Sequence, residues 1–198
     1  MYAASTADGR VGLAVATVKS GKVAVVPMDG ENLTSPCWSE DGEWIYYWSG
    51  SGFGRVRANG SEREEVMRYE RTEYRLRPVY QGGYLYFASK GAPYALGRLH
   101  VATRREEVLV ESAQTSDFAV TARSLYFVKT ARAGRELYRV ALGGAPGTAS
   151  AELVATIPVT EQVPLPLGGF AVSRDESKVV YSMPSGQSLQ LQYIPNFR

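Results

Sequence analysis

Serine and glycine residues gather between Trp48 and Gly54, in the sequence WSGSGFG, and they are the nearest approach to a nucleophile motif in this chain. A serine hydrolase of the α/β type needs Gly-x-Ser-x-Gly, which holds the nucleophile on a strained turn between a strand and a helix. No such pentapeptide occurs in the 198 residues. We therefore interpret the segment as a hairpin loop, and we expect the chain to be no enzyme and to have no catalytic residue.

The chain contains one histidine, His100, and one cysteine, Cys37. An ordinary zinc site takes several His or Cys ligands, so we expect no metal site. Both residues lie in short apolar segments typical of strands, where a structural role explains them most simply. A single cysteine also excludes an intramolecular disulfide. No phosphate-binding loop occurs, and we expect no cofactor.

The segment from Arg68 to Arg77, RYERTEYRLR, combines arginine with tyrosine. Arginine beside tyrosine is typical of protein-binding surfaces, and the same side chains can contact phosphate or stack on bases. A solvated loop explains the segment most simply, a protein partner is the leading functional interpretation, and nucleic acid is disfavoured because Glu70 and Glu73 interrupt the positive charge. The candidate partner-binding residues are Arg68, Tyr69, Arg71, Tyr74, Arg75 and Arg77.

The overall charge also argues against nucleic acid as a partner, because 22 Lys and Arg against 20 Asp and Glu leave a net charge of +2. No apolar run reaches the roughly 20 residues that a membrane helix needs. The first ten residues lack the basic and apolar regions of a secretory signal. This favours the cytoplasm and leaves the periplasm open.

The sequence predicts that any site is positioned by β-strands. The strand pattern is clearest from Ser35 to Gly60. Asp41-Gly42 and Asn59-Gly60 stand between runs of aromatic and β-branched residues, which is the strongest short-range hairpin signal. The stretch therefore predicts three strands of an antiparallel meander. Such a ribbon cannot bury both faces alone and needs neighbours of its own kind.

Those neighbours are predicted by a repeat along the chain. Each unit has a short apolar strand, a turn, a strand with a central apolar anchor, a third strand and a fourth, outer strand such as Glu64–Met67. This pattern predicts an all-β fold, a β-propeller of about five four-stranded antiparallel blades, either closed or an arc of a larger propeller. The anchors are Leu13, Ile45, Leu85, Leu125 and Val179, spaced by 32, 40, 40 and 54 residues. The expected blades of this single domain are 1–34, 35–67, 75–112, 117–157 and 168–198.

The run S-P-x-W-S-x-D-G-x-W-I-Y-Y from Ser35, followed by V-R-A-N-G, resembles the WD-like propeller repeat of TolB-type proteins and of the N-terminal propellers of dipeptidyl-peptidase-type serine peptidases. Residues 2–34 and 170–194 carry the pattern less faithfully, and the two middle repeats lack the Ser-Asp-Gly turn. The ending LQYIPNFR is similar to that of bacterial winged-helix regulators with a C-terminal propeller, which implies a native C-terminus and further sequence upstream.

The resemblance implies two functions. One is a non-catalytic propeller that binds a protein or peptide, as a scaffold or sensory part of a larger bacterial regulator. The alternative is the substrate-gating propeller of a serine peptidase whose hydrolase domain is absent. Peptidases of that family hold a substrate amine with a pair of glutamates, and this chain offers Glu64-Glu65 and Glu106-Glu107. We interpret both pairs as exposed charges on outer strands.

Overall fold

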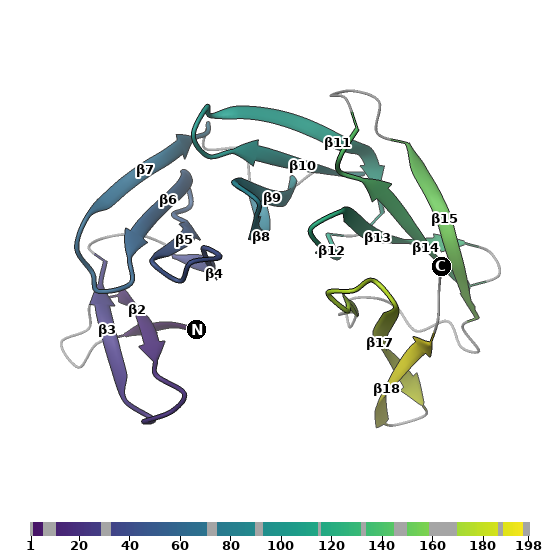
Figure 1. Cartoon of the computed structure of the whole chain (residues 1–198), viewed down its shortest axis with the longest axis horizontal. Coiled ribbons are helices and arrows are strands. Elements are labelled where there is room, and N and C mark those ends of the chain that lie inside the picture. The colour runs from purple at the N-terminus through teal and green to yellow at the C-terminus, as the bar shows by residue number, and fades with distance from the viewer. Residues whose placement is uncertain are drawn as a thin grey trace. The chain divides into compact units, whose positions relative to one another are not determined.

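A computed structural model describes residues 2–5, 11–28, 33–70, 75–89, 93–114, 116–131, 134–144, 150–158, 170–185 and 188–195. Every regular element in these residues is a β-strand, and the strands form five antiparallel sheets in which strands consecutive in the chain are neighbours (Figure 1). No helix long and apolar enough to cross a membrane occurs in this described part. The predicted all-β fold of antiparallel blades is confirmed.

The first sheet contains β1 (Tyr2–Ser5), β2 (Val11–Ala16) and β3 (Val23–Pro27), and the second contains β4 (Thr34–Trp38), β5 (Trp44–Trp48), β6 (Gly52–Arg57) and β7 (Arg63–Arg68). The third contains β8 (Arg75–Gln81), β9 (Tyr84–Ser89), β10 (Tyr94–His100) and β11 (Arg105–Ala113). The fourth contains β12 (Phe118–Val120), β13 (Ser124–Ala131), β14 (Gly134–Ala141) and β15 (Ala151–Pro158). The fifth contains β16 (Phe170–Val172), β17 (Lys178–Ser185) and β18 (Ser188–Pro195).

Two of the five sheets therefore have three strands among the described residues, where the repeat predicts about four. In the first sheet the outermost described strand is β3, and in the fifth it is β18. By its contacts the chain divides into two compact units, residues 1–90 with 97–106 and residues 91–96 with 107–198.

In the first unit the second sheet uses both faces for packing, as the alternation of side chains along a strand requires. Ile45, Tyr47 and Val56 lie in a buried cluster with Leu13 and Val26 of the first sheet. The opposite face of the second sheet packs against the third sheet in a larger buried cluster of Tyr46, Trp48, Phe53, Val66, Leu85, Phe87 and Leu99. These two faces define the surroundings of every candidate site below.

In the second unit a buried cluster contains Tyr126 and Leu137 of the fourth sheet and Val179 of the fifth. All five predicted anchors, in both units, have side chains that are 0% exposed. Burial of the central residue of each second strand is what the stacking of blades requires.

The Ser-x-Asp turn that recurs in the sequence has a defined hydrogen-bonding role. In the second sheet the Ser39 hydroxyl donates to Asp41 Oδ1 at 2.5 Å, and the N–H of Trp44 donates back to Ser39 Oγ at 2.9 Å. In the fifth sheet Ser173 donates to Asp175 Oδ1 at 2.6 Å, and Lys178 N–H donates to Ser173 Oγ at 2.9 Å. The turn thus fastens the first strand of a sheet to the second.

The two turns that lack this motif are held by a glutamate from a neighbouring sheet of the same unit. Glu40 accepts hydrogen bonds from the side chain of Gln81 at 2.5 Å and from the N–H of Gly82 at 2.9 Å. Glu176 accepts hydrogen bonds from the hydroxyls of Thr121 and Ser124 in the equivalent turn of the fourth sheet. Turns that the sequence shows as degenerate are therefore stabilised from outside their own repeat.

Candidate partner-binding site

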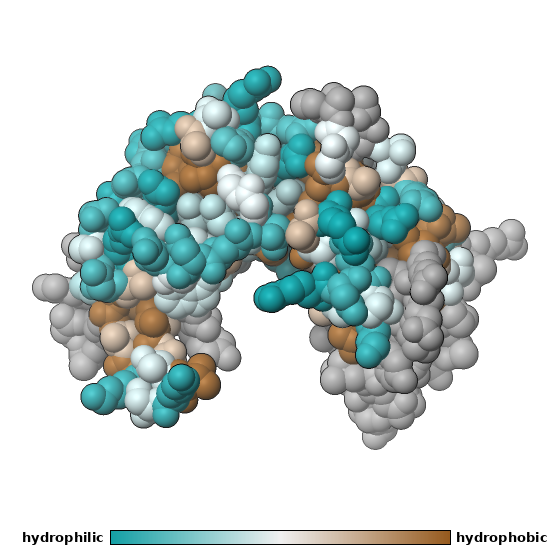
Figure 2. All heavy atoms as spheres, in the orientation of Figure 1, coloured by the Kyte–Doolittle hydropathy of each residue, from teal (hydrophilic) through white to brown (hydrophobic). Residues whose placement is uncertain are grey.

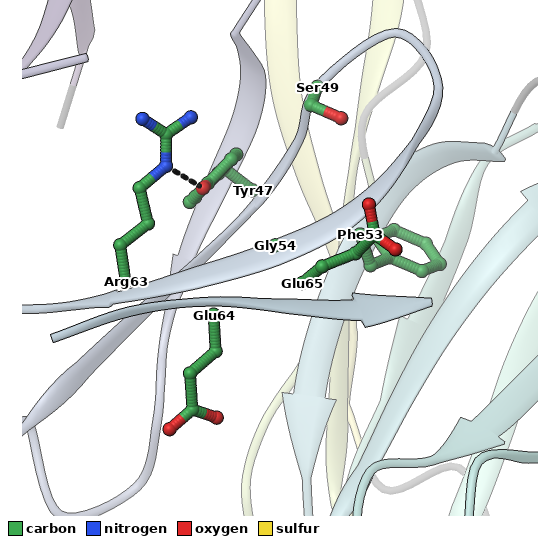
Figure 3. Close-up of a pocket in the computed structure, with 7 residues that line it drawn as sticks. All are labelled: Tyr47, Ser49, Phe53, Gly54, Arg63, Glu64 and Glu65. Carbon is green, nitrogen blue, oxygen red and sulfur yellow. Dashed lines mark hydrogen bonds between the residues drawn. The ribbon is translucent and has the colours of Figure 1, made fainter. Parts of the chain in front are cut away.

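A hollow of about 400 Å³ lies on the side of the second sheet that faces the first sheet (Figure 3). Its floor follows from one cross-strand pair, since Tyr47 of β5 lies opposite Gly54 of β6. A Cβ on residue 54 would come within 2.5 Å of the Tyr47 ring, so only glycine lets the ring lie across this strand. The lining residues are Tyr47, Ser49, Phe53, Gly54, Arg63, Glu64 and Glu65.

The outer wall of the hollow belongs to β7, whose side chains alternate between its two faces. Figure 3 shows Arg63 and Glu65 on one side of this strand and Glu64 pointing to the other. The Nε–H of Arg63 donates to the hydroxyl of Tyr47 at 3.1 Å, which places a guanidinium at the edge of the aromatic floor. The hollow therefore places a cation and a carboxylate beside the nearly buried ring of Tyr47.

The two carboxylates of β7 are each paired with an arginine on their own side of the strand. Glu64 Oε2 accepts hydrogen bonds from Arg55 Nε at 2.9 Å and Nη2 at 2.6 Å. Glu65 Oε2 accepts from Arg68 Nε at 3.0 Å and Nη2 at 2.7 Å. Because Glu64 and Glu65 point to opposite sides, this pair cannot hold one substrate amine together. The interpretation of the pair as charges on an outer strand agrees with this geometry.

A second hollow, of about 380 Å³, lies on the opposite face of the second sheet, toward β8 and the end of β10. The rings of Tyr46 and Tyr80 stack there with centroids 4.8 Å apart. Burial raises the pKa of Tyr46, although the nearby Arg55 guanidinium opposes the shift. The lining is completed mainly by Arg55, Glu64 and Arg104. Since Arg55 and Glu64 neutralise each other, this hollow is less suited to a charged ligand.

His100 lies at the rim of the second hollow and is used in a turn. Its Nδ1 accepts a hydrogen bond from the N–H of Thr103 at 3.1 Å and lies 2.9 Å from the Thr103 hydroxyl. The ring packs edge-on against Tyr84 with centroids 4.8 Å apart. Both contacts agree with the structural role predicted for this histidine.

Cys37 and the segment WSGSGFG also have structural settings. Burial raises the pKa of the Cys37 thiol to about 12, which leaves almost no thiolate at neutral pH. Ser49 closes a hairpin, because its N–H donates to the carbonyl of Gly52 at 2.9 Å and its hydroxyl donates to the same oxygen at 3.1 Å. The predicted hairpin loop is confirmed.

The Arg/Tyr segment between β7 and β8 is partly described, with Arg71 and Tyr74 outside the described residues. Arg68 is exposed and pairs with Glu65, while Arg77 is exposed at the bulge of β8 with a φ of 53°. Neither residue is among those that line the hollow over Tyr47. Whether the segment binds a partner stays a prediction.

Tyr69 and Arg75, by contrast, are brought together as part of the fold. The Tyr69 hydroxyl donates to Glu106 Oε2 at 2.7 Å, and Arg75 Nη2 donates to Glu106 Oε1 at 3.1 Å. The Arg75 guanidinium also lies over the Tyr69 ring, 4.4 Å from its centroid. Burial, and then the Glu106 carboxylate, raise the pKa of Tyr69 well above its ordinary value. The cluster ties the start of β8 to the start of β11.

Sequence reasoning missed this role of Glu106, because it grouped the residue with the exposed charges. Its side chain is 26% exposed and that of Arg75 12%, against 55% for Glu65 and 72% for Arg68. The aromatic hollow was missed as well. Its signal was Gly54 opposite Tyr47 on the neighbouring strand, since a glycine in a strand marks a surface with room for a ring.

No protein-family model and no curated protein sequence matches the chain. Solved structures do match it in fold. The crystal structure of TolB from Acinetobacter baumannii matches with a TM-score of 0.71 at 16% identity, over 94% of this chain and 46% of that one. A structure of a nidogen/laminin complex matches with a TM-score of 0.61 at 11% identity, over 93% of this chain and 70% of that one.

A third match is regucalcin, a calcium-binding protein from Agrobacterium tumefaciens strain C58, with a TM-score of 0.61 at 14% identity, over 91% of this chain and 62% of that one. These likenesses show a β-propeller fold. The chain spans less than half the length of the matched TolB chain.

Proposed function

We propose that the chain is a non-catalytic β-propeller module that binds a protein or peptide partner, as a scaffold or sensory part of a larger bacterial regulator. The hollow over Tyr47 and Gly54 carries the proposal, because three hydrogen-bonded strands place Arg63 and Glu65 around a depression whose floor is the nearly buried ring of Tyr47. Aromatic and arginine side chains in a preformed, rigid setting are the residues that dominate binding energy at protein interfaces.

Two further points support a partner-binding role. The hollow is lined by side chains of positive and negative charge. Such a lining suits a peptide, which has its own hydrogen-bond donors and acceptors, better than a strongly charged ligand. One of the structures with this fold is a complex of two proteins, nidogen and laminin. The propeller of a regulator would supply such a site to the longer protein.

The alternative of a peptidase gate receives no specific support from the geometry. Glu64 and Glu65 diverge (Figure 3), and Glu106 is used by Tyr69 and Arg75. Neither glutamate pair is thus arranged to bind one amine.

Site-specific photo-crosslinking in cells tests the proposal. A photoreactive residue at Glu65, in the hollow, is expected to give a discrete protein adduct, and the same residue at Glu111, exposed on β11, is the matched control. The Glu65 adduct should weaken when Arg63 is changed to Ala. Equal labelling from both positions contradicts the proposal. So does turnover of a peptide or ester by the purified protein that is lost on one side-chain change.

A further inference from the structure

The strand β3 differs from the outermost strands of the middle sheets. β7 carries Arg63, Glu64, Glu65 and Arg68, and charged residues also occur in β11 and β15. Charges on an outer strand protect its open edge from pairing with another chain. β3 has the sequence VAVVP and carries no charge. This composition is typical of an inner strand that pairs with a neighbour at both edges. In the described residues, however, β3 is the outermost strand of the first sheet.

The open edge of β3 offers main-chain hydrogen-bonding groups in a defined order. Thr17 donates its N–H to the carbonyl of Lys22 at 2.8 Å, at the end of the β2–β3 ladder. In an antiparallel ladder, hydrogen-bonded and non-hydrogen-bonded pairs alternate. With Val15 opposite Ala24, the N–H and C=O groups of Val23 and Val25 therefore point away from β2. Pro27, which has no N–H, follows in the same phase, as expected for a proline at a sheet edge.

The side chains of β3 give this edge one apolar face. Val26 is buried in the cluster shared with the second sheet. Val23 and Val25 lie on the other face and are 63% and 39% exposed. Figure 2 shows hydrophobic residues over the β2–β3 hairpin, next to hydrophilic ones. In a strand added at this edge, every second side chain would lie beside these valines on the same face of the sheet.

A strand added beside β3 would have one face on the side of Val23 and Val25. Its other face, on the side of Val26, would lie toward the hollow. Val26 of β3 packs in one cluster with Val56 of β6, and Val56 lies opposite Arg63 of β7. A Cβ on Gly60, in the β6–β7 connection, would lie 3.5 Å from Val26. Because β3 thus covers β6, the next strand outward would run along the first-sheet side of β7. Its inward side chains would reach Arg63 and Glu65.

We propose that the open edge of β3 binds an extended peptide segment of a partner protein as a fourth antiparallel strand. Apolar residues of the peptide lie beside Val23 and Val25, and its alternate, polar residues enter the hollow over Tyr47. The proposal rests on the proposed function and specifies its mode of binding, in which main-chain hydrogen bonds give affinity and alternate side chains give specificity.

The length of the edge favours a peptide over a second copy of the chain. Five residues of strand extend about 17 Å. Pairing two such edges would bury far less than the roughly 1,200 Å² that stable protein interfaces need. A peptide needs only this edge, because its alternating side chains also gain the valine surface and the hollow.

The probe is a fluorescein-labelled Lys-Thr-Val-Thr-Val-Thr-Lys peptide with blocked ends, titrated with the purified chain and followed by fluorescence anisotropy. The control peptide has the same side chains but is N-methylated at two adjacent middle residues, which removes donors from both of its edges. We expect saturable binding of the first peptide and at least about tenfold weaker binding of the second, equivalent to about 1.4 kcal/mol. Equal binding of both peptides, or of neither, overturns the proposal.

Two variants of β3 locate the site. Val25→Pro removes one donor from the open edge and is expected to weaken binding about tenfold or more, whereas Val25→Thr keeps the donor and is expected to bind more tightly than Val25→Pro. Circular dichroism checks the fold of each variant. If Val25→Pro does not fold, Val25→Lys replaces it and imitates the charged outer strands. Unchanged binding by a folded Val25→Pro or Val25→Lys variant overturns the proposal.

Two other results separate this proposal from its alternatives. Light scattering that shows a dimer of the unchanged chain and a monomer of Val25→Pro overturns it in favour of pairing between copies. A Glu65 photo-adduct that persists in Val25→Pro leaves the proposed function intact and overturns strand addition alone.

Discussion

The ring of Tyr47 lies across Gly54 of the neighbouring strand, where a Cβ would approach its hydroxyl oxygen to 2.5 Å. This pair sets the depth of the hollow and places the Tyr47 hydroxyl within hydrogen-bonding distance of Arg63 Nε. The absence of a side chain at Gly54 therefore determines where the Tyr47 ring lies and, through it, where the Arg63 guanidinium lies.

Gly54→Ala is therefore expected to lower the free energy of unfolding by about 1 to 3 kcal/mol, because the added methyl group must displace a packed ring. Urea unfolding measures the effect. Gly143→Ala is the matched control, since a Cβ there meets nothing within 4 Å, and it should change stability by less than about 0.5 kcal/mol. Equal stability of the two variants would show that the Tyr47 ring can move without cost.

The cluster of Tyr69, Arg75 and Glu106 is expected to contribute more to stability than any exposed ion pair in the first unit. Glu106→Ala removes the carboxylate that accepts hydrogen bonds from Tyr69 and from the largely buried Arg75, and it should cost about 1.5 to 3 kcal/mol. Arg68→Ala, which breaks an exposed pair with Glu65, should cost much less, because solvent screens exposed ion pairs. Denaturant unfolding of both variants tests the contrast, and a smaller loss in Glu106→Ala than in Arg68→Ala contradicts it.

The fold could be predicted because its signals are local and repeat. Asp-Gly and Asn-Gly turns predict hairpins directly, and the apolar centre of each second strand recurs often enough to set the phase of five blades. Because a single blade has two apolar faces and cannot bury both alone, the pattern also predicts that blades stack on one another. This is why Leu13, Ile45 and Val179 are all fully buried although their repeats differ in length.

The site was less predictable, because it depends on partners far apart in the chain. Tyr69 and Glu106 are 37 residues apart, and nothing in either local sequence indicates their pairing. The number of strands in the first sheet was also missed, since the repeat predicts a unit and not the loss of its outer strand. The pairing of Tyr47 with Gly54 could have been predicted, because a hairpin closed at Ser49 and Gly52 fixes the register of β5 and β6.

Asp175 makes the turn of the fifth sheet sensitive to acid. Hydrogen bonds from Ser173 and then from Ser177 lower the pKa of its carboxyl group to about 2, well below its ordinary value. A group with a depressed folded-state pKa contributes stability above its unfolded pKa and loses it as the pH falls through the folded value. Asp175→Ala should therefore be less stable than the unchanged chain at pH 6, with the difference disappearing toward pH 2. Urea midpoints across this range measure it, and a constant difference would contradict the assignment.

Glu176 is expected to be the most important acidic residue of the second unit. Its side chain is 9% exposed and accepts hydrogen bonds from Thr121, from Ser124 at 3.3 Å and from Tyr126 at 3.1 Å. Burial opposes its ionisation, but the hydrogen bonds from Thr121 and Tyr126 outweigh burial and lower its pKa.

Glu176→Ala should cost about 2 to 3 kcal/mol, because it removes a largely buried carboxylate that accepts hydrogen bonds from Thr121, Ser124 and Tyr126. Glu40→Ala is the matched control: it removes the equivalent glutamate from the first unit, where the bonds to Gln81 and Gly82 are exposed to water, and it should cost less than about 1 kcal/mol. Thermal and urea unfolding of the two variants compare them directly. If both lose the same stability, the buried hydroxyls of the fourth sheet find other acceptors and Glu176 is not what holds that turn.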